Sequence, residues 1–314
     1  MKRCLILVVL LSLACAANRP KSVQVLESVS AQPPKGLLPL ASFGEIPLGS
    51  SRLNHPQGIA IDMLENLYIT DTGNDRVVKC DSAGDFIKEV GGFGWGQGQF
   101  NRPGYISCDQ GLNIYVVDIQ NKRVQKFDRE LNYVSSIKLE PSGDFTGFGL
   151  LQGIVITPTG EVILSDTEQD YLIRLDNFEE YKSTFGGFNY GEGSVLDPSG
   201  LDTDNKGNIY VADAGRNRIA VYDPFGNYLK SIGESNLRGP RGVDVDANGY
   251  IYVANSGMNN LSVFGSNGDL VLRYGSWGKE MGKFSQPTDI EVRGELVYVV
   301  DSDNNCIQIL QLFR

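Results

Sequence analysis

Residues 198–223 read PSGLDTDNKGNIYVADAGRNRIAVYD, and this stretch decides the fold. It opens on a Pro-x-Gly turn and then alternates apolar and polar residues, a pattern typical of a half-buried strand. A second apolar segment ends at Asp213, and a third begins at Arg218. The stretch therefore predicts three short antiparallel strands joined by tight turns.

The second of these segments, an apolar run that ends in an acid or its amide, recurs six times along the chain. Its copies end at Asp71, Asp118, Asp166, Asp213, Asn255 and Asp301, at intervals of 47, 48, 47, 42 and 46 residues. A strand with a Pro-x-Gly-like entry precedes each copy, beginning at Pro56, Pro103, Leu151, Pro198, Pro240 and Pro287. A fourth strand begins at Phe86, Tyr133, Tyr181, Tyr228 and Leu270. Four short strands in a unit of this length are typical of a β-propeller blade.

An apolar residue also stands three positions before each strand entry. These residues are Leu53, Phe100, Phe148, Val195, Leu237 and Phe284. One repeat unit is too small to bury its own faces, so neighbouring sheets have to pack against one another. We therefore expect the six side chains to fill the space between adjacent blades.

The two ends of the repeat array complement each other. The sixth unit stops at its third strand, CIQILQLF from Cys306, and the segment PLASFG from Pro39 matches a fourth strand. A strand from the N-terminal end that completes the last blade closes the ring with main-chain hydrogen bonds. Pro39 suits an outermost strand, where a missing N–H is tolerated. The sequence predicts an all-β, six-bladed β-propeller of four-stranded antiparallel blades over residues 36–314.

The composite pattern P-x-G-[IV]-x-x-D … G-N-[IL]-Y-[IV]-[AT]-D-x-x-x-x-R-[VI]-x-x-[FY]-D closely resembles the NHL repeat, most clearly at residues 198–223. The third and fifth units depart from it at Leu151, Tyr171, Asn255 and Asn260. The resemblance implies a propeller whose ligands meet the face that carries the Pro-x-Gly loops. Six-bladed relatives include exported binding and sensor domains, gluconolactonase-like calcium enzymes and peptidyl-amide lyases.

The first twenty residues, MKRCLILVVLLSLACAANRP, have the layout of an export signal. The apolar run from Leu5 to Leu13 is too short to cross a ~30 Å hydrocarbon core as a helix. Leu13-Ala14-Cys15 resembles a bacterial lipobox with Cys15 as the site of lipid attachment, although Ser12 departs from the usual aliphatic residue. The alternative is an A-x-A site, Ala14-Cys15-Ala16, which releases a soluble protein.

We therefore expect residues 1–15 to be the signal and residues 16–35, which are polar and contain proline, to be a flexible tether. The protein is expected to be exported to the periplasm or the cell surface. A lipid on Cys15 would anchor it to a bacterial membrane.

Charge and composition exclude several classes of function. A formal net charge of −10 opposes binding to phosphate backbones, so we expect no nucleic-acid partner. Cys80, Cys108 and Cys306 are odd in number and widely spaced, which predicts small buried side chains instead of a disulfide framework. His55 is the single histidine and is expected to be an ordinary surface-loop residue. No metal-ligand spacing occurs, so no metal and no cofactor is expected.

Three arginines stand five places after a strand-end acid. The pairs are Asp71 with Arg76, Asp118 with Arg123, and Asp213 with Arg218. Each arginine is positioned to fold back across the turn between the second and third strands. We interpret the acids as structural caps of that turn, ion-paired with the arginines, and not as a catalytic ring.

Two glycine-rich segments each carry a tryptophan. They are GGFGWGQGQF from Gly91 and YGSWGKEMGKF from Tyr274. Neither opens a helix, as a phosphate-binding loop requires. Exposed aromatic residues are common binding anchors, but we expect Trp95 and Trp277 to pack between blades.

Strand reversal places the Pro-x-Gly loops and the turns after each strand-end acid on one face. Candidate ligand-binding or partner-binding residues there are Arg102, Tyr105, Gln152, Arg216, Arg241, Met258 and Asn259. Their mixture of charge and polarity is typical of a contact surface and contains no catalytic set. The sequence thus predicts a monomeric scaffold for a protein, peptide or glycan partner. The alternative is a calcium-dependent, lactonase-like hydrolase or lyase with a site on the axis.

Overall fold

The computed structural model describes residues 32–109, 112–139 and 145–314. The predicted export signal, the lipid-attachment residue Cys15 and most of the tether lie outside these residues. Among the described residues, no helix has the length and apolar character needed to cross a membrane.

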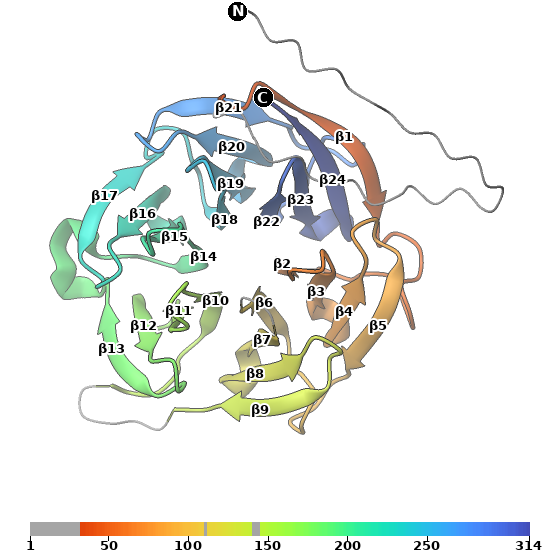
Figure 1. Ribbon diagram of the computed structural model, residues 1–314, viewed down its shortest axis with the longest axis horizontal. Coiled ribbons are helices and arrows are strands. Elements are labelled where there is room, and N and C mark those ends of the chain that lie inside the picture. The colour runs from red at the N-terminus through yellow and green to blue at the C-terminus, as the bar shows by residue number, and fades with distance from the viewer. Residues whose placement is uncertain (1–31, 110–111, 140–144) are drawn as a thin grey trace, which may run out of the picture. The chain divides into compact units, whose positions relative to one another are not determined.

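Six four-stranded antiparallel sheets are arranged as blades around a central axis within the described residues (Figure 1). The innermost strands are β2 (Ile59–Ile61), β6 (Pro103–Cys108), β10 (Leu151–Ile156), β14 (Pro198–Thr203), β18 (Pro240–Val245) and β22 (Pro287–Arg293). The second strands are β3 (Leu67–Asp71), β7 (Asn113–Asp118), β11 (Val162–Asp166), β15 (Ile209–Asp213), β19 (Ile251–Asn255) and β23 (Leu296–Asp301).

The third strands are β4 (Arg76–Cys80), β8 (Arg123–Asp128), β12 (Tyr171–Leu175), β16 (Arg218–Tyr222), β20 (Asn260–Phe264) and β24 (Cys306–Phe313). The outermost strands are β5 (Phe86–Gly91), β9 (Tyr133–Ile137), β13 (Tyr181–Phe185), β17 (Tyr228–Ile232), β21 (Leu270–Tyr274) and β1 (Gly36–Phe43). Short 3₁₀ turns are η1 (Thr72–Asn74), η2 (Ile119–Asn121), η3 (Phe188–Gly193), η4 (Ala214–Arg216), η5 (Ser256–Met258) and η6 (Ser302–Asn304).

We number the blades in chain order, so that blade 1 holds β2–β5 and blade 6 holds β22–β24 with β1. The predicted closure of blade 6 is confirmed. Strand β1 pairs antiparallel with β24, from Gly36 opposite Phe313 to Phe43 opposite Ile307. The ladder shifts register after Pro39, which lies on the edge strand as expected.

The core is divided among the junctions between blades. Six clusters of buried apolar side chains are present in the described residues, one at each junction, including the closing junction between blades 6 and 1. The six predicted plug residues are all buried, one in each cluster: Leu53, Phe100, Phe148, Val195, Leu237 and Phe284. Each blade is therefore stabilised mainly by its two neighbours.

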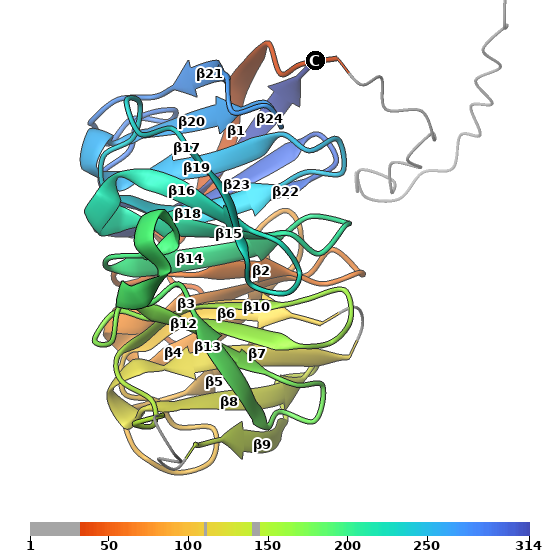
Figure 2. The same ribbon diagram turned by 90° about the vertical axis from the view of Figure 1, so that its left-hand side faces the viewer.

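The strand directions create two faces. The loop face carries the η turns between second and third strands and the connections from each outermost strand to the next blade, residues 44–58, 92–102, 138–139, 145–150, 186–197, 233–239 and 275–286. The hairpin face carries the turns between first and second strands and between third and fourth strands. Figure 2 views the strands from the side, with the two faces at its left and right edges. Strand β1 begins, and β24 ends, on the hairpin face.

The described cysteines form no disulfide. Cys80 and Cys306 are buried, as expected, and Cys108 is half-buried at the end of β6. Burial raises the pKa of all three thiols, which keeps them protonated and unreactive at neutral pH.

Ring closure predicts unequal roles for two neighbouring leucines of β1. Leu37 is 8% exposed and packs in the cluster between blades 5 and 6, whereas Leu38 is 52% exposed. We expect Leu37→Ala to lower the free energy of unfolding by about 2 kcal/mol or more and Leu38→Ala to change it by less than about 0.5 kcal/mol. Urea unfolding measures both. Equal effects would show that β1 does not close the ring.

Candidate functional site

A buried side chain at the end of each second strand fixes the loop before it. In every blade its oxygen accepts a hydrogen bond, 2.7–2.9 Å long, from a backbone N–H two residues before the innermost strand entry. The six acceptors are Asp71, Asp118, Asp166, Asp213, Asn255 and Asp301, all fully buried. We call them the strand-end acceptors. The loop face thus has an internal hydrogen-bond partner in each of the six blades.

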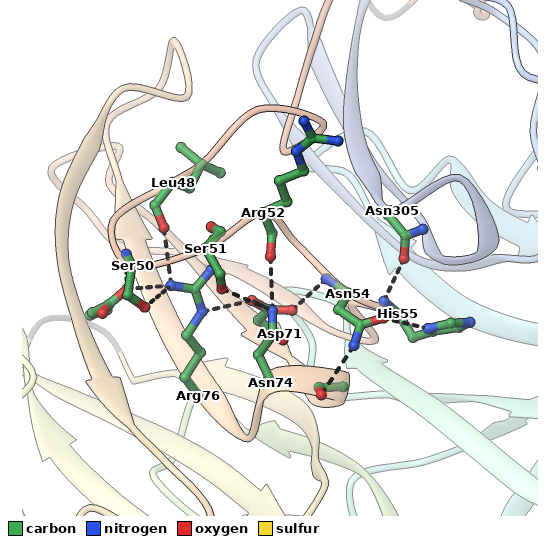
Figure 3. Close-up of polar contacts among 12 residues, drawn as sticks. Leu48, Ser50, Ser51, Arg52, Asn54, His55, Asp71, Asn74, Arg76 and Asn305 are labelled. Carbon is green, nitrogen blue, oxygen red and sulfur yellow. Dashed lines mark hydrogen bonds and ion pairs between the residues drawn. The ribbon is translucent and has the colours of Figure 1, made fainter.

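In blade 1 an arginine extends this contact into a network (Figure 3). Arg76 Nε lies 2.7 Å from Asp71 Oδ2. The guanidinium also donates to the carbonyl oxygens of Leu48 and Ser51, at 3.0 and 2.8 Å. Asn74 Nδ2 donates to Asp71 Oδ2 at 2.8 Å. One buried ion pair therefore holds both the η1 turn and the connection from blade 6.

Blades 2 and 4 repeat the ion pair at 2.7 Å, with Arg123 on Asp118 and Arg218 on Asp213. The predicted pairs are thus brought together, and each arginine also donates to loop carbonyls, for example Arg123 to that of Trp95 at 2.9 Å. Blades 5 and 6 use neutral partners. Asn255 donates to Asn260 Oδ1 at 3.1 Å, and Gln308 donates to Asp301 Oδ2 at 2.8 Å.

A second recurring bond joins adjacent blades. The residue that ends the turn after the strand-end acceptor has a left-handed φ, and its side-chain oxygen accepts the N–H of the residue before the next innermost strand. The acceptors are Asp75, Asp170, Asn217, Asn259 and Asn305, with bonds of 2.7–2.9 Å. Asn and Asp tolerate the left-handed region better than most residues. Between blades 2 and 3 Lys122 takes this position and pairs with Glu168 instead.

The innermost strands approach one another closely at the glycine of the Pro-x-Gly entry. A Cβ on Gly153 would lie 2.1 Å from the carbonyl oxygen of Ser199, and one on Gly242 would lie 2.6 Å from the Cα of Asp289. Glycine is therefore required at both positions. Blades 2 and 6 carry Tyr105 and Asp289 there, and both side chains lie at the axis.

Tyr105 reaches across the axis. Its side chain is 5% exposed, and its hydroxyl lies 2.7 Å from the carbonyl oxygen of Thr288, 2.9 Å from that of Arg241 and 3.1 Å from Ser199 Oγ. These partners belong to β22, β18 and β14, on the blades across the ring from β6 (Figure 1). Because they stand at the start of their strands, the tyrosine closes the axis at its loop-face end.

Acids line half of the axis beyond Tyr105. Blades 4, 5 and 6 carry Asp202, Asp244 and Glu291 at one register, where the other blades carry Ala60, Ser107 and Val155. Asp202 Oδ2 accepts the Val245 N–H and Asp244 Oδ2 accepts the Val292 N–H, both at 2.7 Å. Asp289 Oδ2 accepts the Ile59 N–H at 2.9 Å. Each aspartate therefore links its blade to the next.

Burial raises the pKa of all four axial carboxyls. That of Asp289 rises to about 8. The negative charge of Asp244 adds to the effect of burial on Asp202 and Glu291. A side-chain hydrogen bond between Asp202 and Asp244 also contributes to the raised pKa of Asp202. The raised pKa values favour the protonated carboxyls at neutral pH. The axis therefore carries less negative charge than four ionised acids would give it.

The axial residues do not fit a metal centre. Asp202, Asp244 and Asp289 each use an oxygen for a backbone N–H of the next blade. No cluster of three or more His, Cys, Asp or Glu side chains in the described residues is arranged to hold a metal ion. The axial cavity has a volume of about 40 Å³, room for a few water molecules and far less than the ~300 Å³ of a small-molecule site.

A family model described as the NHL repeat matches residues 196–222, which include β14, β15 and β16. Residues 196–222 thus match one NHL repeat, and the described residues fold as a six-bladed β-propeller. A search of curated protein sequences finds no relative.

Solved structures share this propeller fold at low sequence identity. A gluconolactonase from Xanthomonas campestris is 13% identical, with a TM-score of 0.62 over 90% of this chain and 99% of that one. A virginiamycin B lyase from Staphylococcus aureus is 12% identical, with a TM-score of 0.60 over 88% and 99% of the two chains. A Bacteroides thetaiotaomicron protein of unknown function is 15% identical, with a TM-score of 0.61 over 85% and 71%.

Most of the predicted contact residues lie on the loop face of the propeller. Arg102, Arg216 and Met258 are exposed there, and Gln152 is half-buried. Arg241 pairs with Asp197 across the junction of blades 4 and 5, at 3.2 Å.

Two of the predicted contact residues have other roles. Tyr105 is buried across the axis instead of displayed on the face, because it replaces a glycine at the closest approach of the innermost strands. Asn259 uses its side-chain oxygen to accept the Gln286 N–H at 2.9 Å, so it joins blade 5 to blade 6. An alignment of the repeats contains a sequence signal for each role. Tyr105 is a large residue at a position where most repeats have glycine, and Asn259 is one of the Asn or Asp residues that recur at the end of the turn.

The expectation that the tryptophans pack between blades is wrong. Trp95 is 67% exposed and Trp277 is 73% exposed. The packing role in each loop belongs to the plug residue that follows, Phe100 or Phe284, which leaves the tryptophan in solvent. His55 is exposed on the loop face as expected, and its backbone N–H donates to Asn305 across the closing junction, at 2.7 Å (Figure 3).

The buried ion pair of blade 4 can be compared with the amide pair of blade 5. Arg218→Asn leaves the fully buried Asp213 carboxylate without its cation, so we expect a loss of about 3–5 kcal/mol in the free energy of unfolding. The double variant Asp213→Asn/Arg218→Asn copies Asn255 and Asn260 and should be more stable than the single variant. Urea unfolding at pH 7 decides. A double variant no better than the single one would contradict the ion-pair account.

The axial carboxyls predict a pH dependence. Folding raises their pKa above the ordinary carboxyl value, so the folded state binds more protons, and stability falls as the pH rises from about 4 toward 8 and above. Asn at position 202 keeps an acceptor for the Val245 N–H and a donor to Asp244. Asp202→Asn should therefore be more stable than the wild type at pH 9 and nearly equal at pH 5. The matched control is Asp303→Asn, which changes an exposed acid. An equal loss at both pH values would refute this.

Proposed function

We propose that this NHL propeller is a binding scaffold that presents its loop face to a protein, peptide or glycan partner. The loop-face backbone is held from within by the strand-end acceptors, and side chains such as Arg102, Arg216 and Met258 project from it. A surface that is already ordered loses little conformational entropy on binding. This combination supports recognition by the surface itself.

The observation that carries the proposal is the closure of the axis by Tyr105. Its hydroxyl contacts three blades across the ring, and the cavity beyond it is about 40 Å³. A substrate approaching from the loop face meets this side chain and not an axial pocket. A ligand on this face would therefore contact the loops and turns around Tyr105.

We also propose that the protein is exported and held to a bacterial membrane through a lipid on Cys15, in the periplasm or at the cell surface, as a monomer. Strand β1 begins at Gly36 on the hairpin face. The first strand of the propeller thus begins on the face opposite the proposed binding surface.

An axial enzyme is the second candidate function, because the solved neighbours include a lyase and a gluconolactonase. The hydrogen-bonded Asp202–Asp244 pair favours it, since carboxyls with raised pKa values serve as general acids. One solved structure of the virginiamycin B lyase from Staphylococcus aureus is that of a catalytically inactive His-to-Ala variant. In this chain the one histidine, His55, lies on an exposed loop and contacts Asn54 Oδ1. The scaffold accounts for more of the structure.

Site-specific photo-crosslinking in the producing cells tests the scaffold. A benzophenone amino acid in place of Arg102 or Arg216 should give discrete adducts, because both positions are exposed on the loop face. The same amino acid in place of Lys206, exposed on the hairpin face, is the control. Adding Arg241→Glu should weaken the loop-face adducts. Adducts from Lys206 alone would place the partner on the other face and overturn the proposal. Stoichiometric calcium in the purified protein, with calcium-dependent lactone hydrolysis, would establish the enzyme instead.

A further inference from the structure

Two loop-face connections share one internal scaffold. They are residues 92–100, between blades 1 and 2, and residues 276–284, between blades 5 and 6. A parallel bridge closes each loop, Phe93 with Phe100 in the first and Trp277 with Phe284 in the second. We call these two connections the aromatic loops.

The last residue of a 3₁₀ turn holds each aromatic loop at the same point. Asn121 Nδ2 donates to the carbonyl oxygen of Gly94 at 2.9 Å. Asn304 Nδ2 donates to that of Gly278 at 2.8 Å. The two glycines have the same φ of 158°, so the backbones turn alike at this point.

A buried glutamine on the third strand holds the far side of each loop. Gln125 accepts the Gly98 N–H at 3.0 Å and donates to the carbonyl oxygen of Gln99 at 2.7 Å. Gln308 accepts the Gly282 N–H at 2.8 Å and donates to the carbonyl oxygen of Lys283 at 2.6 Å. Both loop backbones are therefore fixed without help from the side chains that point outward.

Those outward side chains are large and apolar. Phe93, Trp95, Trp277 and Met281 are exposed, although Phe100 and Phe284 already supply the packing of the two loops. Phe93 and Trp277 occupy equivalent bridge positions. Rigid aromatic side chains displayed on an ordered backbone are the usual anchors of a binding surface.

Resting on the proposed function of the loop face, we infer that the aromatic loops bind an uncharged glycan chain. Phe93 and Trp95 stand edge to face, with ring centroids 5.2 Å apart and an interplanar angle of 71°. In this arrangement one ring can stack on the C–H face of a sugar while the other ring contacts the edge of the same sugar. The apolar face of a peptide helix would fit this geometry less well. The neighbouring exposed Gln97 offers a neutral amide for hydroxyl groups.

Charge also favours an uncharged ligand. The protein carries a formal net charge of −10, which opposes acidic polysaccharides. On the second loop Lys283 pairs with Glu280 at 3.2 Å, which offsets its charge. The connection between blades 6 and 1 lies between the two aromatic loops in ring order, and it exposes a further apolar side chain, Ile46.

The chain has two tryptophans, and both lie on the aromatic loops, so intrinsic fluorescence reports directly on this surface. Titration with three uncharged hexamers, cellohexaose, maltohexaose and fully N-acetylated chitohexaose, should change the fluorescence with at least one of them. By calorimetry, Trp95→Ala and Trp277→Ala should each weaken that binding about tenfold. Phe225→Ala is the matched control, because Phe225 is an 84% exposed aromatic residue on the hairpin face and its loss should change nothing.

Failure of this inference is distinct from failure of the scaffold. If no hexamer binds while loop-face crosslinking captures a protein, the scaffold stands and the glycan inference is wrong. Binding that Phe225→Ala weakens as much as Trp95→Ala would also overturn it, because the sugar would then lie elsewhere. If neither sugar nor crosslink is found on the loop face, both proposals fail.

Discussion

The structure depends on one repeated interaction, a buried oxygen at the end of each second strand that accepts a backbone N–H from the adjoining loop. A fully buried carboxylate is costly unless its hydrogen bonds and its charge are satisfied. Blades 1, 2 and 4 satisfy it with arginine, blade 6 satisfies its hydrogen bonds with glutamine and asparagine, and blade 5 uses asparagine as the acceptor. The side chain that ends the strand therefore also orders the loop, and the loop face becomes part of the rigid framework.

The function we propose depends on the side chains of the loop face that these hydrogen bonds leave exposed. The backbone of the loop face is fixed, the axis is closed by Tyr105, and the side chains that remain free are those pointing into solvent. The axial aspartates link neighbouring blades by accepting N–H groups from the next blade, and desolvation at these half-buried positions raises the pKa values of Asp202 and Asp244. The buried polar side chains thus mainly stabilise the fold. The outward aromatic side chains have no packing role and are available to bind a partner.

The sequence predicted the architecture because every strand is marked by a local signal that recurs at a fixed period. The blade count, the closure by β1 and the plug residues followed from these signals and are confirmed. Single departures from the repeat were harder to interpret. Tyr105 lies where blades 1, 3, 4 and 5 have glycine, and only the spacing of the innermost strands shows that its side chain must cross the axis. The prediction that the tryptophans pack between blades is wrong because the repeat period alone does not tell which aromatic side chain of a loop, Phe100 or Trp95, points inward.

Amide hydrogen exchange measured by NMR tests the central claim most directly, that the strand-end acceptors make the loop face as rigid as the blades. The relevant amides are those of Asn54, Asn101, Gly149, Leu196, Arg238 and Ser285. We predict that all six exchange as slowly as amides in the central strands, because opening them requires the buried acceptor to lose its partner. Exchange at the rate of unprotected loop amides would contradict it.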